Sequence, residues 1–209
     1  MSQTSAARRL PYTWDDYRSW PDDQRWELID GEAYAMSPGP SVRHQRIQLD
    51  LGAQLLDHFR DRPCEPFVSP IDVKLSETDV VQPDLAVVCE PEKIRPSHID
   101  GAPTLVIEIL SPSSGPRDRG PKMDLYARAG VREVWLVTPF PPCLEVFVLD
   151  GAAYRRHAVL VQAEPLASPA FPDLRLDLAP LFAQPPEPGD EVPEVKEPPG
   201  RYRAASAPA

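Results

Sequence analysis

Apolar residues recur at intervals of four along one segment of the chain, between Ser41 and Arg60. This spacing predicts an amphipathic helix whose apolar stripe packs against a sheet, and the Ser41 side chain can cap its N-terminus. His44 lies one turn before the stripe, so we expect it on or beside the buried face. The stripe consists of Ile47, Leu51, Leu55 and Phe59.

Other stretches follow the alternating or fully apolar patterns of β-strands. A second helix is predicted at 121–129, where Pro121 takes the first position and Gly130 ends the helix. A short helix follows Thr13, which together with Asp16 has the pattern of a capping box. These elements predict an α/β fold of the α+β type, in which a central mixed sheet is flanked by helices. The predicted strands are 67–75, 85–88, 104–110, 133–138, 144–149 and 154–160.

The dipeptide Asp30-Gly31 between two alternating stretches predicts a β-hairpin. A two-residue turn would pair Glu27 with Tyr34 and would put Glu27 and Glu32 on one face of the sheet. Two acids on a sheet face are usually part of a solvated surface. They become candidates for chemistry only if other acids converge on them.

Proline content and charge set further limits. The chain of 209 residues has 28 prolines, which excludes a helical bundle or a coiled coil. Seven prolines fall within 185–209, so we expect one domain at 12–182, between a flexible N-terminus at 1–11 and a Pro-rich disordered tail at 183–209. The formal net charge of −10 disfavours simple polyanion binding. A nucleic-acid ligand would therefore need a local basic patch or a bound cation.

The three cysteines, Cys64, Cys89 and Cys143, lie far apart and include no CxxC pair. This pattern indicates neither a disulfide framework nor a zinc site, and we expect three free thiols in a reducing compartment. The N-terminal sequence lacks the apolar core of a signal peptide, and no stretch is long enough to span a membrane. A cytoplasmic location is therefore predicted.

An acidic residue, Glu108, interrupts the strand predicted at 104–110, whose other residues are apolar or β-branched. A buried carboxylate is unfavourable unless it forms an ion pair or binds a metal, and an ion pair with an arginine explains Glu108 alone equally well. Asp84 precedes the strand predicted at 85–88, and adjacent antiparallel strands could bring the two acids together. Two carboxylates at one point repel each other unless a divalent cation such as Mg²⁺ neutralises them.

A cation follows the acidic strand. Lys122 and Tyr126 lie four residues apart in the second predicted helix, so they share a face. The chain has only four lysines, and the N-terminus of a helix is an unfavourable place for a positive charge. Both facts favour a specific role for Lys122 over that of a solvated lysine. The sequence contains no GxSxG motif, no Walker A loop and no HExxH pair.

Six segments of the chain carry a combined pattern: WELIDGE (26–32), the helix with His44, PDLAVV (83–88), VIEILSPSS (106–114), K-x-x-x-Y (122–126) and AGVREVWLVTP (129–139). In this order they resemble a large bacterial family of restriction-endonuclease-like proteins within the PD-(D/E)XK nuclease superfamily. The resemblance covers roughly residues 12–160. It implies a restriction-endonuclease-like core and a site that cleaves DNA phosphodiester bonds with Mg²⁺ or Mn²⁺.

The catalytic residues of this family match three positions of the sequence. Asp84 and Glu108 match the acids of the PD and E-x-K motifs, which implies that both bind the metal and act in catalysis. Leu110 stands where the superfamily has its lysine. The resemblance implies that Lys122, on the following helix, takes the place of that catalytic lysine.

The resemblance also implies supporting residues. Glu27 matches an acid that can join the metal site, and the carbonyl of Ile109 would be a further metal ligand. His44 and Tyr126 would support the site. The arginines around the second helix could form the basic patch for DNA, with Arg117 and Arg119 as substrate-binding residues. They are Arg117, Arg119, Arg128 and Arg132.

Three functions from different classes are compatible with these residues. The first is a metal-dependent endonuclease that acts on DNA, and it is the leading hypothesis. The second is a catalytically silent module with a nuclease fold that binds nucleic acid or a partner protein. The third is an enzyme that uses the same two acids on a small phosphate ester. Because duplex cleavage by such folds often uses two copies, we also consider a homodimer, and we expect no membrane partner.

Overall fold

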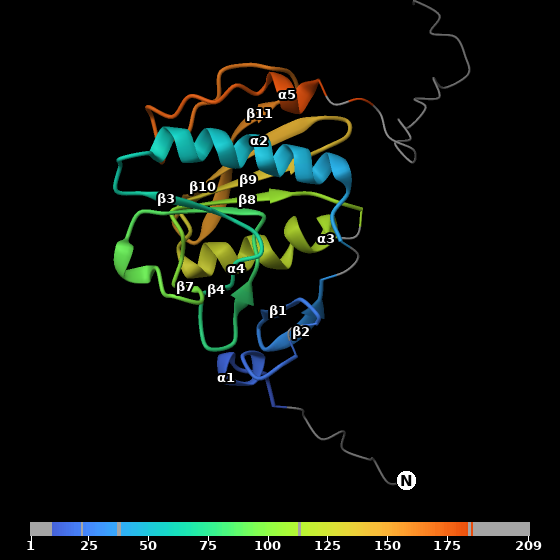
Figure 1. Cartoon of the computed structure of the whole chain (residues 1–209), viewed down its shortest axis with the longest axis vertical. Coiled ribbons are helices and arrows are strands. Elements are labelled where there is room, and N and C mark those ends of the chain that lie inside the picture. Colours follow the sequence, from blue (N-terminus) through green and yellow to red (C-terminus); the bar gives the residue numbers. More distant parts are fainter. Residues whose placement is uncertain (1–9, 22, 37–38, 113, 184, 186–209) are drawn as a thin grey trace, which may run out of the picture.

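The computed structural model describes residues 10–21, 23–36, 39–112, 114–183 and 185. They form a mixed α+β fold with two sheets (Figure 1). The larger sheet contains β3 (Glu65–Val68), β6 (Leu85–Val88), β8 (Leu105–Ile109), β9 (Glu133–Thr138), β10 (Cys143–Asp150) and β11 (Ala153–Leu160). Their order is β11-β10-β9-β8-β6-β3, and only β8 and β9 run parallel.

The second sheet consists of shorter strands: β1 (Trp26–Ile29), β2 (Glu32–Ala35), β4 (Val73–Lys74), β5 (Val80–Val81) and β7 (Ile99–Asp100). Their order is β2-β1-β5-β4-β7. The helices are α1 (Trp14–Tyr17), α2 (Val42–Phe59), α3 (Gly115–Asp118), α4 (Pro121–Ala129), α5 (Ala179–Phe182) and the 3-10 helix η1 (Pro91–Lys93). Figure 1 shows α2 and α4 on opposite faces of the larger sheet, with the second sheet on the side of α4.

Successive side chains of β8 point to opposite faces of the larger sheet, so this strand contributes to two apolar clusters. Leu105, Ile107 and Ile109 pack in one apolar cluster with α2. Val106 packs on the other face, in a cluster that includes residues of α4. Glu108 shares the face of Val106. The charged residue of β8 therefore points toward α4 and the second sheet.

The predicted helices are confirmed. α2 begins after Ser41, whose side chain accepts a hydrogen bond from the His44 amide (3.2 Å), and the predicted apolar stripe of α2 is buried. α4 has the predicted bounds, and Gly130 follows it with a φ of 86°, in the left-handed region that favours glycine. α1 has the predicted capping box between Thr13 and Asp16.

The predicted hairpin is confirmed as well. β1 and β2 pair with Glu27 opposite Tyr34, which is the register of a two-residue turn. The two acids of this face lie in different environments: Glu27 is buried and Glu32 is exposed. Only Glu27 therefore points into the space between the hairpin and the rest of the domain.

The strand predicted at 67–75 is wrong, and the sequence does not predict the second sheet. This segment contains the end of β3 and then β4, which belong to different sheets, and Pro70 lies between them. A proline has no N–H to donate to a neighbouring strand, which favours a break at this point. β5 and β7 are missing from the sequence-based prediction, because strands of two residues are too short to show a period.

The prediction of three free thiols is wrong for two cysteines. Cys64 precedes β3 and Cys89 follows β6, and these strands pair with Glu65 opposite Val88. The antiparallel register therefore places the two cysteines opposite each other, and they form a disulfide, whereas Cys143 is free. The pairing depends on strand register, which the separation of 25 residues in the sequence does not reveal. The free-thiol argument for a reducing compartment no longer applies to this pair.

Two predicted segments lie mostly outside the described residues. The tail predicted at 183–209 is described only at Ala183 and Pro185, and the N-terminus predicted at 1–11 only at Leu10 and Pro11. Across the described parts of the chain, the helices are too short or too polar to cross a membrane.

Candidate active site

The two acids of the predicted metal site lie on adjacent strands. β6 and β8 pair antiparallel with Leu85 opposite Ile107, so Asp84 and Glu108 face each other one position further along. The backbone N–H of Ile109 donates to Oδ2 of Asp84 (2.7 Å). This hydrogen bond ties the Asp84 side chain to the end of β8. The two strands are antiparallel neighbours, as the sequence analysis expects.

Lys122 lies at the centre of a buried group of carboxylates. Its Nζ is 2.7 Å from Oε1 of Glu108, 2.9 Å from Oε1 of Glu27 and 3.4 Å from Oδ1 of Asp118. The lysine side chain is 2 % exposed. Each acid comes from a different element: β1 carries Glu27, β8 carries Glu108, and α3 ends at Asp118. The ammonium group therefore connects both sheets and the α3–α4 corner at one point.

Two further side chains hold the paired acids. The Tyr126 hydroxyl donates to Oε1 of Glu108 (2.5 Å), and Nε2 of His44 lies 3.2 Å from Oδ2 of Asp84. The α2 helix supplies His44 from its first turn, and α4 supplies Tyr126 one turn after Lys122. The structure thus groups seven residues named from the sequence: Glu27, His44, Asp84, Glu108, Ile109, Lys122 and Tyr126.

Glu27 accepts hydrogen bonds at one oxygen and faces an arginine with the other. Its Oε1 accepts from the backbone N–H of Gln82 (3.1 Å) as well as from Lys122. Its Oε2 lies 3.7 Å from the guanidinium of Arg117, which also stacks on the Tyr34 ring at 4.7 Å from the centroid. The Glu27 carboxylate is therefore directed at two cations of the protein.

Burial alters the protonation of these groups. It raises the pKa of Glu108 well above its ordinary value, although the charge of Lys122 opposes this. Burial also raises the pKa of Asp118, and again the Lys122 ammonium opposes it. Burial by itself would lower the pKa of Lys122, but the surrounding carboxylates hold that pKa well above its ordinary value. Lys122 is therefore an ammonium ion, whereas Glu108 and Asp118 take up a proton more readily than ordinary carboxyl groups do.

We refer to four acids as the acidic cluster: Glu27, Asp84, Glu108 and Asp118. When all four are ionised, their charge exceeds that of Lys122 and Arg117 by two, which is the charge of one Mg²⁺. Asp84 and Glu108 each keep one oxygen, Oδ1 and Oε2, that accepts no hydrogen bond from the described residues.

These donor atoms fit a magnesium site. Among the residues described, no three side chains of His, Cys, Asp or Glu are arranged as ligands of one ion. Mg²⁺ commonly takes one or two carboxylates and completes its coordination with water. Asp84 and Glu108 could supply the two carboxylates, and the Ile109 carbonyl a further oxygen.

The predicted arginine patch is largely paired with acids. Arg119 lies 2.5 Å from a carboxylate oxygen of Glu145, and Arg128 lies 2.7 Å from Asp30. Arg132 is exposed. Because these pairs cancel charge, the surface around α4 is less positive than the number of arginines suggests.

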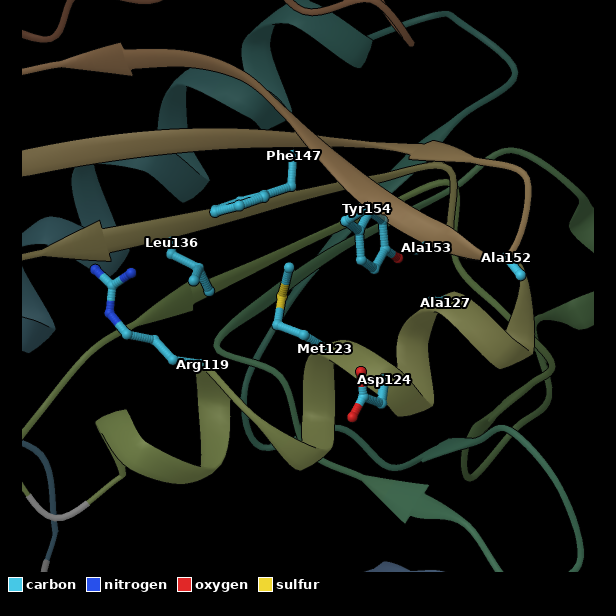
Figure 2. Close-up of a pocket in the computed structure, with 9 residues that line it drawn as sticks. All are labelled: Arg119, Met123, Asp124, Ala127, Leu136, Phe147, Ala152, Ala153 and Tyr154. Carbon is cyan, nitrogen blue, oxygen red and sulfur yellow. The ribbon is translucent and has the colours of Figure 1, made fainter.

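Arg119 also lies at a pocket on the flank of α4 that faces β9, β10 and β11 (Figure 2). The pocket has a volume of about 270 Å³ and is lined in part by Met123, Phe147 and Tyr154. Its lining residues do not include the members of the acidic cluster. This pocket and the acidic cluster are therefore separate features of the domain.

Sequence reasoning misses three residues that belong to this site. Asp118 lies four residues before Lys122, a spacing that indicates contact within a helical segment and could have identified it. Gln48 donates to the backbone carbonyl of Asp84 (2.9 Å), and the Gln82 amide donates to Glu27. These two glutamines contact residues far from them in the sequence, so no local pattern reveals them.

A family model described as Uma2, putative restriction endonuclease, matches residues 14–179. The chain belongs to the Uma2 family. The matched range includes Lys122 and every member of the acidic cluster, and the resemblance noted in the sequence is confirmed. The description of the Uma2 family supports a nuclease function for the protein.

A solved structure has a similar fold. It is the crystal structure of a putative nuclease belonging to DUF820 from Anabaena variabilis ATCC 29413. The TM-score is 0.68 at 21 % sequence identity, and the likeness covers 82 % of this chain and 98 % of that chain. At this identity the likeness concerns the fold alone, and it confirms the predicted fold class for this Uma2 protein.

Two relatives come from Synechocystis sp. (strain ATCC 27184 / PCC 6803 / Kazusa). The uncharacterized protein slr1290 is 32 % identical over 126 residues, which cover 59 % of this chain and 66 % of that protein. The uncharacterized protein sll1609 is 29 % identical over 135 residues, which cover 63 % of this chain and 70 % of that protein. The chain thus spans slightly less than two thirds of slr1290.

Proposed function

We propose that this Uma2 protein is a divalent-metal-dependent endonuclease that hydrolyses DNA phosphodiester bonds with Mg²⁺ or Mn²⁺. One observation carries the proposal: when its four acids are ionised, the charge of the acidic cluster exceeds that of Lys122 and Arg117 by two, beside two carboxylate oxygens without a donor among the described residues. The family description of Uma2 supports nuclease chemistry, and the Anabaena protein of similar fold is described as a putative nuclease.

In this proposal Asp84 and Glu108 hold the cation, with the carbonyl of Ile109 as a further ligand. A cation bound there supplies a Lewis acid, which polarises the phosphate and lowers the pKa of the attacking water. The protein fixes the opposite oxygen of each acid. Tyr126 donates to Oε1 of Glu108, and Oδ2 of Asp84 accepts from the Ile109 amide. Both acids are thereby oriented before the cation arrives.

Lys122 is the proposed catalytic cation. Its buried ammonium offsets the negative charge that builds on the phosphate oxygens in the transition state, and it orients the attacking water. Burial strengthens this effect, because the charge acts through a medium of lower dielectric than water. We propose that Glu27 acts mainly on Lys122 and Arg117, and that its negative charge favours metal binding by offsetting the positive charge of these two residues. His44 would support Asp84 from the side of α2.

DNA is the proposed substrate despite the net charge of −10. The bound cation would supply part of the attraction for phosphate. Arg117 is 27 % exposed beside Glu27, so we propose that it contacts a phosphate next to the scissile bond. Arg119, which is partly exposed, would contact the backbone further along. A homodimer would provide two such sites for the two strands of a duplex.

Cleavage of supercoiled plasmid tests the proposal. We expect nicked and linear DNA with Mg²⁺ or Mn²⁺, and no product when a chelator is present. A model phosphodiester tested in parallel distinguishes a DNA nuclease from an enzyme for small esters. Metal-dependent DNA binding without any cleavage would contradict the proposal and would favour a catalytically silent module.

A further inference from the structure

We propose that Asp118 is a positioning residue. Together with Glu27, Asp118 holds the Lys122 ammonium group in place when Glu108 binds the metal. The inference rests on the proposed function, and it gives a role to an acid outside the predicted metal-binding and catalytic set. Its basis is the geometry around the lysine nitrogen.

The Lys122 ammonium has three N–H groups and three carboxylate neighbours. Glu108 is nearest at 2.7 Å, Glu27 lies at 2.9 Å, and Asp118 lies at 3.4 Å. A lysine stem is long and flexible, so its charged end stays in one place only if several groups hold it. Three acids from three elements restrain Lys122 from different directions.

Glu108 cannot provide this restraint alone, because it also serves the proposed metal site. A divalent cation on Glu108 would offset the charge that attracts Lys122 and would itself repel the ammonium. Glu27 would then remain, but its carboxylate is shared with Arg117 and the Gln82 amide. Asp118 is the third acid in contact with Lys122, so its negative charge would balance that of the ammonium group when Glu108 binds the metal.

The surroundings of Asp118 point to the same role. The side chain is 5 % exposed, and Lys122 is the one cation in salt-bridge distance of it among the described residues. A buried acid is unfavourable unless it is paired, so its position is explained by the lysine. The corner between α3 and α4 fixes the two residues relative to each other. A Cβ at Gly120 would lie 3.0 Å from the Pro116 carbonyl oxygen, which shows how tightly this corner is closed.

The test compares Asp118→Asn with Asp124→Asn, which removes an exposed acid from α4. In Asp118→Asn we expect kcat for plasmid cleavage to fall about 10- to 100-fold, the scale of a misplaced catalytic group. We expect KM to stay unchanged and the Mn²⁺ affinity, measured by electron paramagnetic resonance, to fall much less than kcat, because Asp118 contributes charge to the acidic cluster but contacts the lysine and not the proposed metal ligands. Asp124→Asn should match the wild type in all three. Wild-type kcat in a folded Asp118→Asn protein would overturn the inference, as would an equal loss in both variants.

A second readout is independent of cleavage. The chain has four lysines, so isotope labelling of lysine gives four side-chain NMR signals, and Lys122→Arg identifies one of them. In the wild type with Mg²⁺ we expect the Lys122 ammonium protons to exchange slowly with water, and in Asp118→Asn to exchange faster. Asp118→Ala serves as a second variant if Asp118→Asn does not fold. An unchanged exchange rate of the Lys122 ammonium protons in either folded variant would overturn the inference.

The two readouts separate the inference from the function on which it rests. A wild-type protein that cleaves no DNA would contradict the proposed function. The NMR comparison would still decide whether Asp118 restrains the lysine. A wild type that cleaves, with an Asp118→Asn variant of equal kcat, would refute the role of Asp118 and leave the nuclease proposal intact.

Discussion

Two buried acidic regions of the larger sheet differ in how their charge is satisfied. Glu133, on β9, has an exposed fraction of 0 % and accepts hydrogen bonds at both oxygens, from the Trp135 indole (2.6 Å) and the Ala170 amide (2.8 Å). In the acidic cluster, three carboxylates surround Lys122, and Glu108 keeps one oxygen without a donor among the described residues. Donors of the protein satisfy the acid of the first region, whereas the second region, when its acids are ionised, has an excess of negative charge.

The difference shows that a buried carboxylate is not by itself a sign of chemistry. Neutral donors fully satisfy Glu133, so its hydrogen bonds explain its position on structural grounds alone. At Glu108, burial raises the pKa well above its ordinary value, and the neighbouring acids raise it further against the opposing charge of Lys122. Perturbed acids with a charge excess are typical of functional sites. The four predictions below test this distinction, from the largest expected effect to the smallest.

Changing an acid of the proposed metal site should have the largest effect. In Asp84→Asn or Glu108→Gln we expect plasmid cleavage to be abolished and Mn²⁺ binding to weaken, because each change removes a metal ligand. Folding should be retained, since removing one of several repelling carboxylates relieves repulsion. Glu133→Gln is the matched control, and it should cleave plasmid at the wild-type rate. Full cleavage by Asp84→Asn would refute the assignment of the metal site.

Removing the buried lysine should affect both activity and stability. Lys122→Ala leaves several buried carboxylates without their cation, so we expect it to lower the free energy of unfolding by about 3–5 kcal/mol. Cleavage by the folded fraction should fall about 100-fold, the scale of losing a positioned electrostatic group. Chemical denaturation and plasmid kinetics on the same samples measure the two effects.

The control for the lysine is an arginine on the same helix. Arg128 pairs with Asp30 at the surface, and its side chain is 51 % exposed. Because exposed pairs contribute little, we expect Arg128→Ala to change stability by less than about 1 kcal/mol. Equal losses of stability in Lys122→Ala and Arg128→Ala would show that the buried ion pairs of Lys122 stabilise the fold no more than an exposed ion pair does.

The third prediction concerns the structural acid. Glu133→Ala removes the acceptor of a buried indole N–H and a backbone N–H, so we expect a loss of about 1–3 kcal/mol in the free energy of unfolding. Cleavage per folded molecule and Mn²⁺ affinity should not change. Thermal denaturation and electron paramagnetic resonance provide the two measurements. A loss of metal binding in this variant would remove the distinction between the two regions.

The two main helices and the β1–β2 hairpin could be predicted because their signals are local. The stripe on α2, Pro121 and Gly130 at the ends of α4, and the Asp30-Gly31 turn each lie within one short segment. The rest of the second sheet could not be predicted in the same way. Its two-residue strands show no periodicity and depend on contacts between distant segments.

The candidate site shows the same limit. Glu108 and Lys122 are conspicuous in the sequence, because a charge interrupts an apolar strand and a cation begins a helix. Glu133 begins another apolar strand, and nothing local indicates that neutral donors satisfy it. The Trp135 indole is two residues away, but the Ala170 amide is 37 residues away in the sequence. Only the fold reveals which buried acid has an excess of charge.

The smallest effect is expected from removing the Pro-rich tail, whose acidic residues are not part of the acidic cluster. We expect removal of residues 186–209 to change the melting temperature by no more than about one or two degrees, because this segment is rich in proline and poor in core-forming residues. Pro185 is retained, since its carbonyl accepts a hydrogen bond from Arg43. Cleavage rate and Mn²⁺ affinity should also stay the same.

The truncation removes five acidic and three basic residues, so it makes the net charge less negative without changing the acidic cluster. A large change in metal affinity would mean that overall charge, and not the local excess at Asp84 and Glu108, controls cation binding. Unchanged affinity in the truncated protein, together with its loss in Asp84→Asn, would locate the effect in the cluster.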